Sequence, residues 1–488
     1  MDLIPTPILT NVTFFENTAD NEGGGIYNFD GFYAGEEAFS SPTLTNCILW
    51  GNSPDQIGND TDSSATVTYS VIQAGYPDGT NIIDADPKLD PTLADNGGFT
   101  QTHALQTGSP AIDAANPNVC PTTDQRGFPR PVDGDGNGTA SCDIGAYEYI
   151  NYGPVLFAKP GSSGDCSSWS NACDLSQALV LAQPGFQIWA AAGTYKPTED
   201  TDRNATFQLK NSLAIYGGFA GTETSLDQRD WETNPTILSG DIGTLDDNTD
   251  NSYHVVTGSG VDTTAILDGF TITGGANQGD ITPTNQGGGM YINCGKPALK
   301  NIVFYNNTAS YGGGLYSRCE SNKENAPTLT NVVFDQNTAV YHGGGIYTSR
   351  NNLELTNITF SNNKAGIGGG MNNYQSDPSL TNITFIENEA QNQGGAMANH
   401  DSSPILTNVT FSGNKATGTN GSGYGSGMYN DDSRPRLTNV TFTLNQAIIN
   451  GGAMYNTGDP IQGSKPVITN AIIWGNIGGQ IVDESPSS

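Results

Sequence analysis

Basic residues are scarce in this sequence. Its 488 residues include 18 Lys and Arg against 50 Asp and Glu, which gives a formal net charge of −32. A surface that binds nucleic acid or an anionic membrane needs the opposite sign of charge. We therefore exclude DNA, RNA and anionic membranes as partners. The same acidity favours solubility and attracts divalent cations.

Long apolar runs are missing as well. No stretch is apolar over the roughly 20 residues that a transmembrane helix needs, so the sequence predicts no membrane span. The opening residues Met-Asp-Leu-Ile-Pro have neither the basic nor the apolar segment of a secretion signal. We expect any signal for export to lie outside this sequence.

What the sequence does contain is one stretch repeated many times. A period of 25 to 31 residues, with no helical pattern inside it, indicates a solenoid of stacked β-coils. Connections between parallel strands are right-handed in nearly all cases. We therefore predict an all-β fold, a right-handed parallel β-helix. The period is marked by the asparagines Asn301, Asn331, Asn357, Asn382, Asn408, Asn439 and Asn470.

Each coil is predicted to contain three short strands. In the copy around Asn331, Leu329 belongs to the first strand, Val332 to the second, and Gly343-Gly-Gly-Ile346 leads into the third. Asn331 is placed at the corner between the first two strands, because asparagine tolerates the left-handed backbone of a sharp turn. Stacked copies can hydrogen-bond amide to amide, so we interpret the seven repeated asparagines as a ladder.

The repeats fall into two modules with a non-repetitive segment between them. Residues 1–57 are expected to be the terminal coils of a first β-helix, and residues 58–150 its C-terminal cap. A cap is needed because an open solenoid end exposes strand edges and apolar core. Residues 151–286 are predicted to form an N-terminal cap, with a short helix near 174–183, and the irregular first coils of a second β-helix.

The second module is expected to be incomplete at its C-terminus. Its regular repeats occupy residues 287–488 and end on a near copy of Asn46-Cys-Ile-Leu-Trp-Gly-Asn52, 424 residues further along the chain. The first copy leads into a cap, whereas the second does not. Because module ends offer unpaired strand edges, we expect head-to-tail self-association, which makes filaments when the contact does not close.

Seven cysteines are present, and none lies in a Cys-x-x-Cys motif. Local pairing in an acidic chain rich in asparagine and threonine indicates an oxidising, extracellular setting. Cys47 is left over, and we expect it to be a buried thiol. The expected pairs are Cys120 with Cys142, Cys166 with Cys173, and Cys294 with Cys319.

The repeats resemble a known family. Phe334-Asp-Gln-Asn337 followed by Gly343-Gly-Gly-Ile346 resembles the FxxN and GGA(I/L/V) repeats of bacterial polymorphic outer-membrane proteins. Residues 95–148 are similar to the segment before a membrane anchor in secreted bacterial β-helix proteins of the choice-of-anchor type. Residues 185–275 are similar to the first coils of pectate-lyase-like proteins.

This resemblance implies an extracellular or cell-surface bacterial protein. It favours a non-enzymatic structural stalk or adhesin, whose partner would be a cell-surface glycan or protein. The same superfamily also contains polysaccharide lyases, so a lyase or a glycan-binding β-helix is the alternative.

A calcium site is expected in the cap. Asp133, Asp135 and Asn137 have the 1-3-5 spacing by which a tight loop wraps Ca²⁺. The usual glutamate at the twelfth position is absent, and Asp143 lies one residue before it. We predict a structural calcium ion bound by these four residues, against the alternative of a plain Asp/Gly turn.

Catalytic residues are not identified by the sequence. A lyase of this fold needs clustered carboxylates and a Lys or Arg base on one face. Asp241, Asp246, Asp247 and Asp250 offer carboxylates, but the arginines are scattered singly. These arginines are Arg203, Arg229, Arg318 and Arg350.

Tyrosines follow the glycines at the same position of several coils. They can form a surface on which sugar rings stack, or a ladder that stabilises neighbouring coils. We favour the ladder. Partner specificity, where it exists, is expected in insertions such as 317–327 and 417–427. The tyrosines are Tyr291, Tyr316, Tyr347, Tyr429 and Tyr455.

Overall fold

The structure is a computed structural model, and it forms two compact units, residues 1–152 and 153–488. In the described part of the chain, no helix is long and apolar enough to cross a membrane. The residues described are 7–33, 36–94, 96, 100–127, 130–135, 137, 139–149, 155–277, 285–321, 323–418, 422–459 and 463–484.

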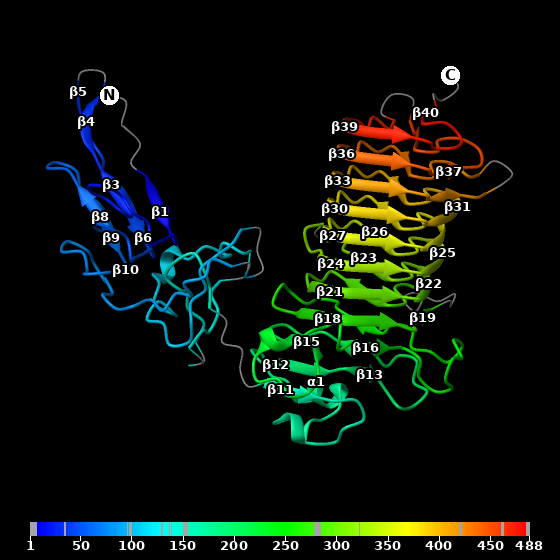
Figure 1. Ribbon diagram of the computed structural model, residues 1–488, viewed down its shortest axis with the longest axis horizontal. Helices are drawn as coiled ribbons and strands as arrows, with labels where there is room; N and C mark the ends of the chain where they lie inside the picture. The colour runs from blue at the N-terminus through cyan, green and yellow to red at the C-terminus, as the bar shows by residue number, and fades with distance from the viewer. Residues whose placement is uncertain are drawn as a thin grey trace. The chain divides into compact units, whose positions relative to one another are not determined.

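The second unit is a stack of coils whose strands form three parallel sheets (Figure 1). The largest sheet runs through β11 (Val155–Ala158), β12 (Gln187–Ala191), β15 (Ala214–Phe219), β18 (Ile266–Thr273), β21 (Ala298–Tyr305), β24 (Thr328–Asp335), β27 (Glu354–Ser361), β30 (Ser379–Ile386), β33 (Ile405–Ser412), β36 (Arg436–Thr443) and β39 (Val467–Trp474), with β13 (Gly193–Tyr195) and β16 (Thr236–Ser239) beside this path. The predicted parallel β-helix is confirmed.

Two further sheets complete each coil. One contains β14 (Phe207–Gln208), β17 (Val256–Thr257), β20 (Met290–Asn293), β23 (Leu315–Arg318), β26 (Ile346–Ser349), β29 (Met371–Tyr374), β32 (Met397–His400), β35 (Met428–Asp431), β38 (Met454–Thr457) and β40 (Ile481–Asp483). The other contains β19 (Ala276–Asn277), β22 (Thr308–Tyr311), β25 (Thr338–His342), β28 (Lys364–Ile367), β31 (Glu389–Gln393), β34 (Lys415–Ala416) and β37 (Gln446–Ala447).

Each regular coil has three strands, but they are not the three that we predicted. Asn331 does have a left-handed backbone, with φ 55°. The chain bends there without leaving the sheet, because Thr330 still pairs with Thr356 and Val332 with Ile358. The two strands expected around Asn331 are therefore one bent strand. The missing strand is Thr338–His342, which the sequence analysis did not identify.

The core of the second unit is built from the same positions in every coil. Leu329, Val332, Phe334 and Ile346 are all at most 1% exposed, and their equivalents in neighbouring coils are also buried. The phenylalanine rings stack along the axis with centroids 4.4–5.0 Å apart. This spacing matches the separation of neighbouring strands, so each coil repeats the packing of the previous one. The stack contains Phe304, Phe334, Phe360, Phe385, Phe411 and Phe442.

A short helix covers the first coil of the second unit. Helix α1 spans Leu175–Leu181, and Asp174 caps it by accepting a hydrogen bond from Ser176 N. Leu175 and Leu179 are buried, and the helix packs against β11 and β12. The helix expected near 174–183 is therefore present. Single 3-10 turns lie at Pro117–Val119, Trp169–Asn171 and Leu226–Gln228.

The first unit contains shorter parallel strands and an irregular segment. Its sheets are β1 (Ile8–Thr10), β6 (Thr43–Thr45) and β9 (Thr66–Thr68); β2 (Thr13–Phe15), β7 (Ile48–Trp50) and β10 (Val71–Ile72); and the pair β3 (Ile26–Asn28) and β8 (Ile57–Asn59). An antiparallel hairpin joins β4 (Asp30–Tyr33) to β5 (Glu36–Phe39).

The irregular segment after β10 covers the last regular coil of the first unit. Ile48 and Val71 from the coils share one hydrophobic cluster with Leu105, Ala111 and Ile144 from this segment. Ile48 is 1% exposed and Ile144 is fully buried. The segment thus shields the apolar end of the coil from water. We refer to this segment, residues 73–149, as the cap.

Candidate functional site

The seven predicted corner asparagines form a hydrogen-bonded row on the outside of the second unit. Each side-chain Nδ2 donates to the Oδ1 of the preceding asparagine over 3.0–3.2 Å. The first member, Asn301, donates to Asp268 Oδ1 over 2.7 Å. Because this row is exposed to water, it fixes the bend of each coil more than it stabilises the core.

A second asparagine row, which the sequence analysis did not assign, lies inside the core. In Asn363, both the backbone N and Nδ2 donate to Asn388 Oδ1, over 3.1 and 2.9 Å, and Nδ2 also donates to Phe334 O. Unpaired polar groups at this depth would be costly, so the row holds the coils in register. The FxxN pattern could have predicted this row, because its last residue is the buried asparagine. The row is Asn307, Asn337, Asn363, Asn388, Asn414, Asn445 and Asn476.

A glutamine ends the buried row. Asn476 Nδ2 donates to Gln480 Oε1 over 2.8 Å, where another coil would present an asparagine. In the first unit, Asn52 Nδ2 donates to Gln56 Oε1 over 2.7 Å in the same way. The two near-identical coils therefore satisfy their last amide within the coil.

The tyrosines form two separate stacks. Tyr316 lies between Tyr291 and Tyr347, at ring-centroid distances of 5.6 and 5.3 Å. Tyr429 and Tyr455 stack at 5.9 Å. The positions between these stacks are occupied by Asn372 and Ala398, which pair with each other in the sheet. A continuous sugar-stacking stripe is therefore not formed.

One surface pocket adjoins the first tyrosine stack. It has a volume of about 340 Å³ and opens beside the sheet formed by β23, β26 and β29. Two arginines from neighbouring coils meet here, which corrects the expectation that the arginines are scattered singly. The pocket is lined by Asn285, Gln286, Tyr311, Tyr316, Arg318, Tyr347, Ser349, Arg350 and Tyr374.

A single carboxylate bridges these two arginines. Glu320 Oε1 contacts Arg318 Nη2 and lies 2.9 Å from Arg350 Nη1. Arg350 Nε also donates to Gln375 Oε1 over 2.8 Å. The three charged side chains are 39–55% exposed, so a ligand can reach them. The local charge is positive in a strongly acidic chain.

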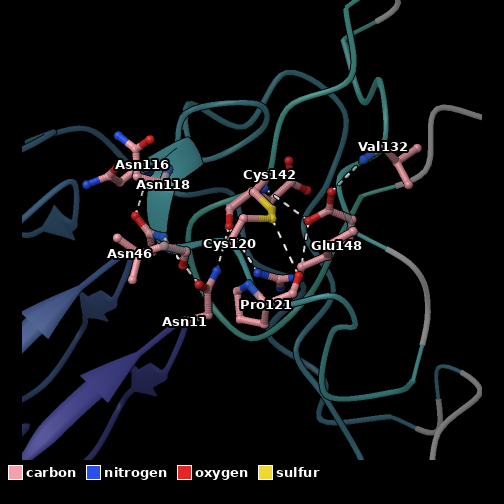
Figure 2. The surroundings of a disulfide bond; sticks show 12 residues. Asn11, Asn46, Asn116, Asn118, Cys120, Pro121, Val132, Cys142 and Glu148 are labelled. Atoms are coloured by element: carbon pink, nitrogen blue, oxygen red, sulfur yellow. Dashed lines mark hydrogen bonds and ion pairs between the residues drawn. A yellow bond between two sulfur atoms is a disulfide. The ribbon is translucent and has the colours of Figure 1, made fainter.

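All six cysteines expected to pair are joined by disulfide bonds. Cys120 is bonded to Cys142 in the cap, beside Glu148 and two asparagines of the first unit with positive φ, Asn11 and Asn46 (Figure 2). The other bonds join Cys166 to Cys173 and Cys294 to Cys319. The remaining Cys47 is free and buried, as expected, and burial raises the pKa of its thiol to about 11.

The cap brings three carboxylates together, but not the expected set. Asp113, Asp133 and Asp135 place one oxygen each within 4.8 Å of one another, and no other such group occurs in the described ranges. Asn137 lies beside them, and its backbone N donates to Asp133 Oδ1 and Asp135 Oδ1. Asp113 was missed because it lies 20 residues before the motif. Three oxygen donors of this kind suit Ca²⁺.

Asp143 belongs to a different, buried network. Its Oδ1 accepts a hydrogen bond from Asp113 N over 2.7 Å, so it holds the backbone of one of the three clustered aspartates in place. Glu148 accepts hydrogen bonds from Val132 N and Asp143 N and forms an ion pair of 3.2 Å with Arg130 (Figure 2). Burial, followed by repulsion from Glu148, raises the pKa of Asp143 to about 8. Burial also raises the pKa of Glu148 to about 7.

Comparisons with known proteins find similarity in the repeats. The Chlamydia polymorphic membrane protein repeat matches residues 11–28, 301–318 and 331–349. The solved pectate lyase Pel9A is similar over 65% of this chain and 78% of its own, with 14% identity and a TM-score of 0.35. No curated protein matches the sequence significantly. Three stretches of this chain are thus similar to the repeat of the polymorphic membrane proteins.

Proposed function

We propose that this chain is an extracellular bacterial surface protein in which the β-helix serves as a stalk or adhesin-like scaffold and stacks end to end with further copies. The repeat match supports the surface location, since the matching family is named for membrane proteins. Three disulfide bonds support an oxidising environment.

The observation that carries the proposal is the apolar end of the second unit. Strand β39 pairs with β36 on one side and is the last strand of its sheet among the residues that the structure describes. Ile472, Trp474 and Ile477 are 63%, 76% and 59% exposed. Large apolar side chains clustered beside a free strand edge are typical of an interaction surface.

The first coil of the first unit, in a second copy, is the partner that this surface fits. Residues 9–14 read Leu-Thr-Asn-Val-Thr-Phe, identical to residues 437–442 in the coil that β39 already packs against. Strands β1, β2 and β3 each lie at the edge of their sheet in the described residues. Stacking this coil on β39 would extend the parallel pairing by one copy, and repetition would give a filament.

Gln480 indicates which interactions would stabilise such a contact. It accepts the last hydrogen bond of the buried asparagine row, from Asn476. The contact therefore depends on strand edges and apolar side chains and not on a continued asparagine row. Its strength should increase with salt, because screening reduces the repulsion between two chains of charge −32.

The test compares two substitutions of the same kind. Ile472→Lys places a charge on the exposed end, whereas Ile405→Lys places one on the side of the stack, where Ile405 is 50% exposed. We expect sedimentation velocity to show concentration-dependent assembly of the unsubstituted chain and of Ile405→Lys, but not of Ile472→Lys. Monomers at all concentrations, or equal loss in both variants, would contradict end-to-end stacking.

A further inference from the structure

The pocket beside the tyrosine stack lies at a corner of the coil that has no side chains of its own. The chain passes from β22 into β23 through Gly312-Gly-Gly314 and repeats this turn in the next coil. A side chain at Gly313 would bring its Cβ within 2.5 Å of Thr338 O, so the corner must stay bare. Side chains on either side of this corner, such as Tyr311 and Tyr316, line the hollow.

Tyrosine rings form the walls of this hollow. Tyr311 meets Tyr347 edge to face, with centroids 5.6 Å apart. Tyr347 is held in place by stacking on Tyr316, with an interplanar angle of 15°. Tyr374, one coil further, is 38% exposed. Rigid aromatic surfaces of this kind suit the apolar face of a sugar ring.

The charged side of the pocket is electropositive. Arg318 and Arg350 share one carboxylate, Glu320, so two positive charges face one negative charge. The disulfide between Cys294 and Cys319 fixes the backbone next to Arg318. A planar guanidinium binds a carboxylate through two hydrogen bonds, and a ligand carboxylate can take the place of the exposed Glu320.

We propose that this pocket binds an acidic saccharide. The sugar carboxylate lies between Arg318 and Arg350, and the ring lies against Tyr311 and Tyr347. A peptide is disfavoured because β23 is paired on both sides, by β20 and β26, and offers no free edge for an added strand. This ligand site goes beyond the proposed stalk and is independent of β39.

Calorimetric titration with a tetramer of galacturonic acid tests the proposal, using its methyl ester as a neutral ligand of the same shape. The acid should bind and the ester should bind at least about tenfold more weakly. Arg350→Gln should weaken binding about tenfold. Arg436→Gln, an exposed arginine on β36, makes the same change of net charge and should have no effect.

A gain-of-function variant separates binding from folding. Glu320→Gln removes the internal competitor for both arginines, so it should tighten binding of the acid several-fold, while a purely structural ion pair would give no gain. Absence of binding to the unsubstituted chain, equal affinity for the ester, or equal affinity for polyglutamate would each overturn the proposal. Assembly can be scored in the same samples, so failure here is distinct from failure of end-to-end stacking.

Discussion

The coils that contain β7 and β39 have similar sequences but differ in their surroundings, because β10 and the cap pack on the first, whereas β39 is the last strand of its sheet in the described residues. Ile48 is 1% exposed, whereas its counterpart Ile472 is 63% exposed. Trp50 is half-buried and Trp474 is 76% exposed. The local pattern is nearly the same, so the difference comes from what packs on the coil. The sequence of a coil thus determines its backbone shape. The residues that pack on the coil determine how much its apolar side chains contribute to stability.

Placing a charge at the two equivalent positions should give the largest contrast. Ile48→Lys buries an unpaired ammonium under the cap and should destabilise the first unit by about 3 kcal/mol or more. Ile472→Lys leaves its charge in water and should change stability by less than about 0.5 kcal/mol. Urea unfolding followed by tryptophan fluorescence measures both. Similar losses would mean that the end of the second unit is covered within the same chain.

Removing the disulfide of the cap should sharpen the comparison further. Cys142→Ser opens a loop of 22 residues and should lower the stability of the first unit by about 2–4 kcal/mol. The second unit should unfold as before, because none of its coils depends on that bond. Calorimetry with two resolved transitions is the measurement. A shift of both transitions would show that the units unfold together.

Lowering the pH should stabilise the first unit, which contains the cap, and should not stabilise the second unit in the same way. Raised pKa values mean that Asp143 and Glu148 bind protons more tightly in the folded state than in the unfolded state. Their contribution is therefore fully present below the unfolded values near 4 and is lost as the pH rises through about 7 to 8.

We expect the first unit to be more stable at pH 5 than at pH 8.5 by about 2 kcal/mol. Asp143→Asn should flatten this dependence, and Asp262→Asn, an exposed carboxylate of the second unit, should not. Melting curves at several pH values provide the measurement. An unchanged slope in Asp143→Asn would remove this carboxyl from the explanation.

Calcium should have the smallest effect of the four. Asp113, Asp133 and Asp135 repel one another without a cation, so Ca²⁺ at ten times its dissociation constant should stabilise the cap by about 1.4 kcal/mol. Asp133→Asn combined with Asp135→Asn should abolish that gain. Asp246→Asn combined with Asp247→Asn makes the same charge change outside the cap and serves as control. Equal melting temperatures with calcium and with chelator would contradict a calcium site.

Much of the fold follows from the sequence because each coil repeats its neighbours. Asn331 and its equivalents marked the bend correctly, since few residues other than asparagine and glycine accept a positive φ there. The strand Thr338–His342 was missed because it has little apolar pattern: Ala339 is buried, but Val340 and Tyr341 are about half exposed. Its position is set by pairing with the coils on either side and not by its own residues.

The candidate sites were harder to predict because their parts are distant in sequence. Asp113 meets Asp135 through the folding of the cap, and Arg318 meets Arg350 because one coil separates them. The spacing of residues within a short motif cannot predict either of these two contacts. Asp143 was wrongly grouped with the loop motif for the same reason, since its side chain points into the buried network of the cap.

The buried asparagine row has a consequence for how such a protein can change in length. Each amide of the row makes the same hydrogen bonds to the coils on either side, so a whole coil from Asn388 to Asn414 can be duplicated or deleted without disturbing its neighbours. Each added or removed coil changes the length of the second unit by about 4.8 Å. The length of the second unit is thus adjustable in equal increments, while its end coils and its pocket keep their chemistry.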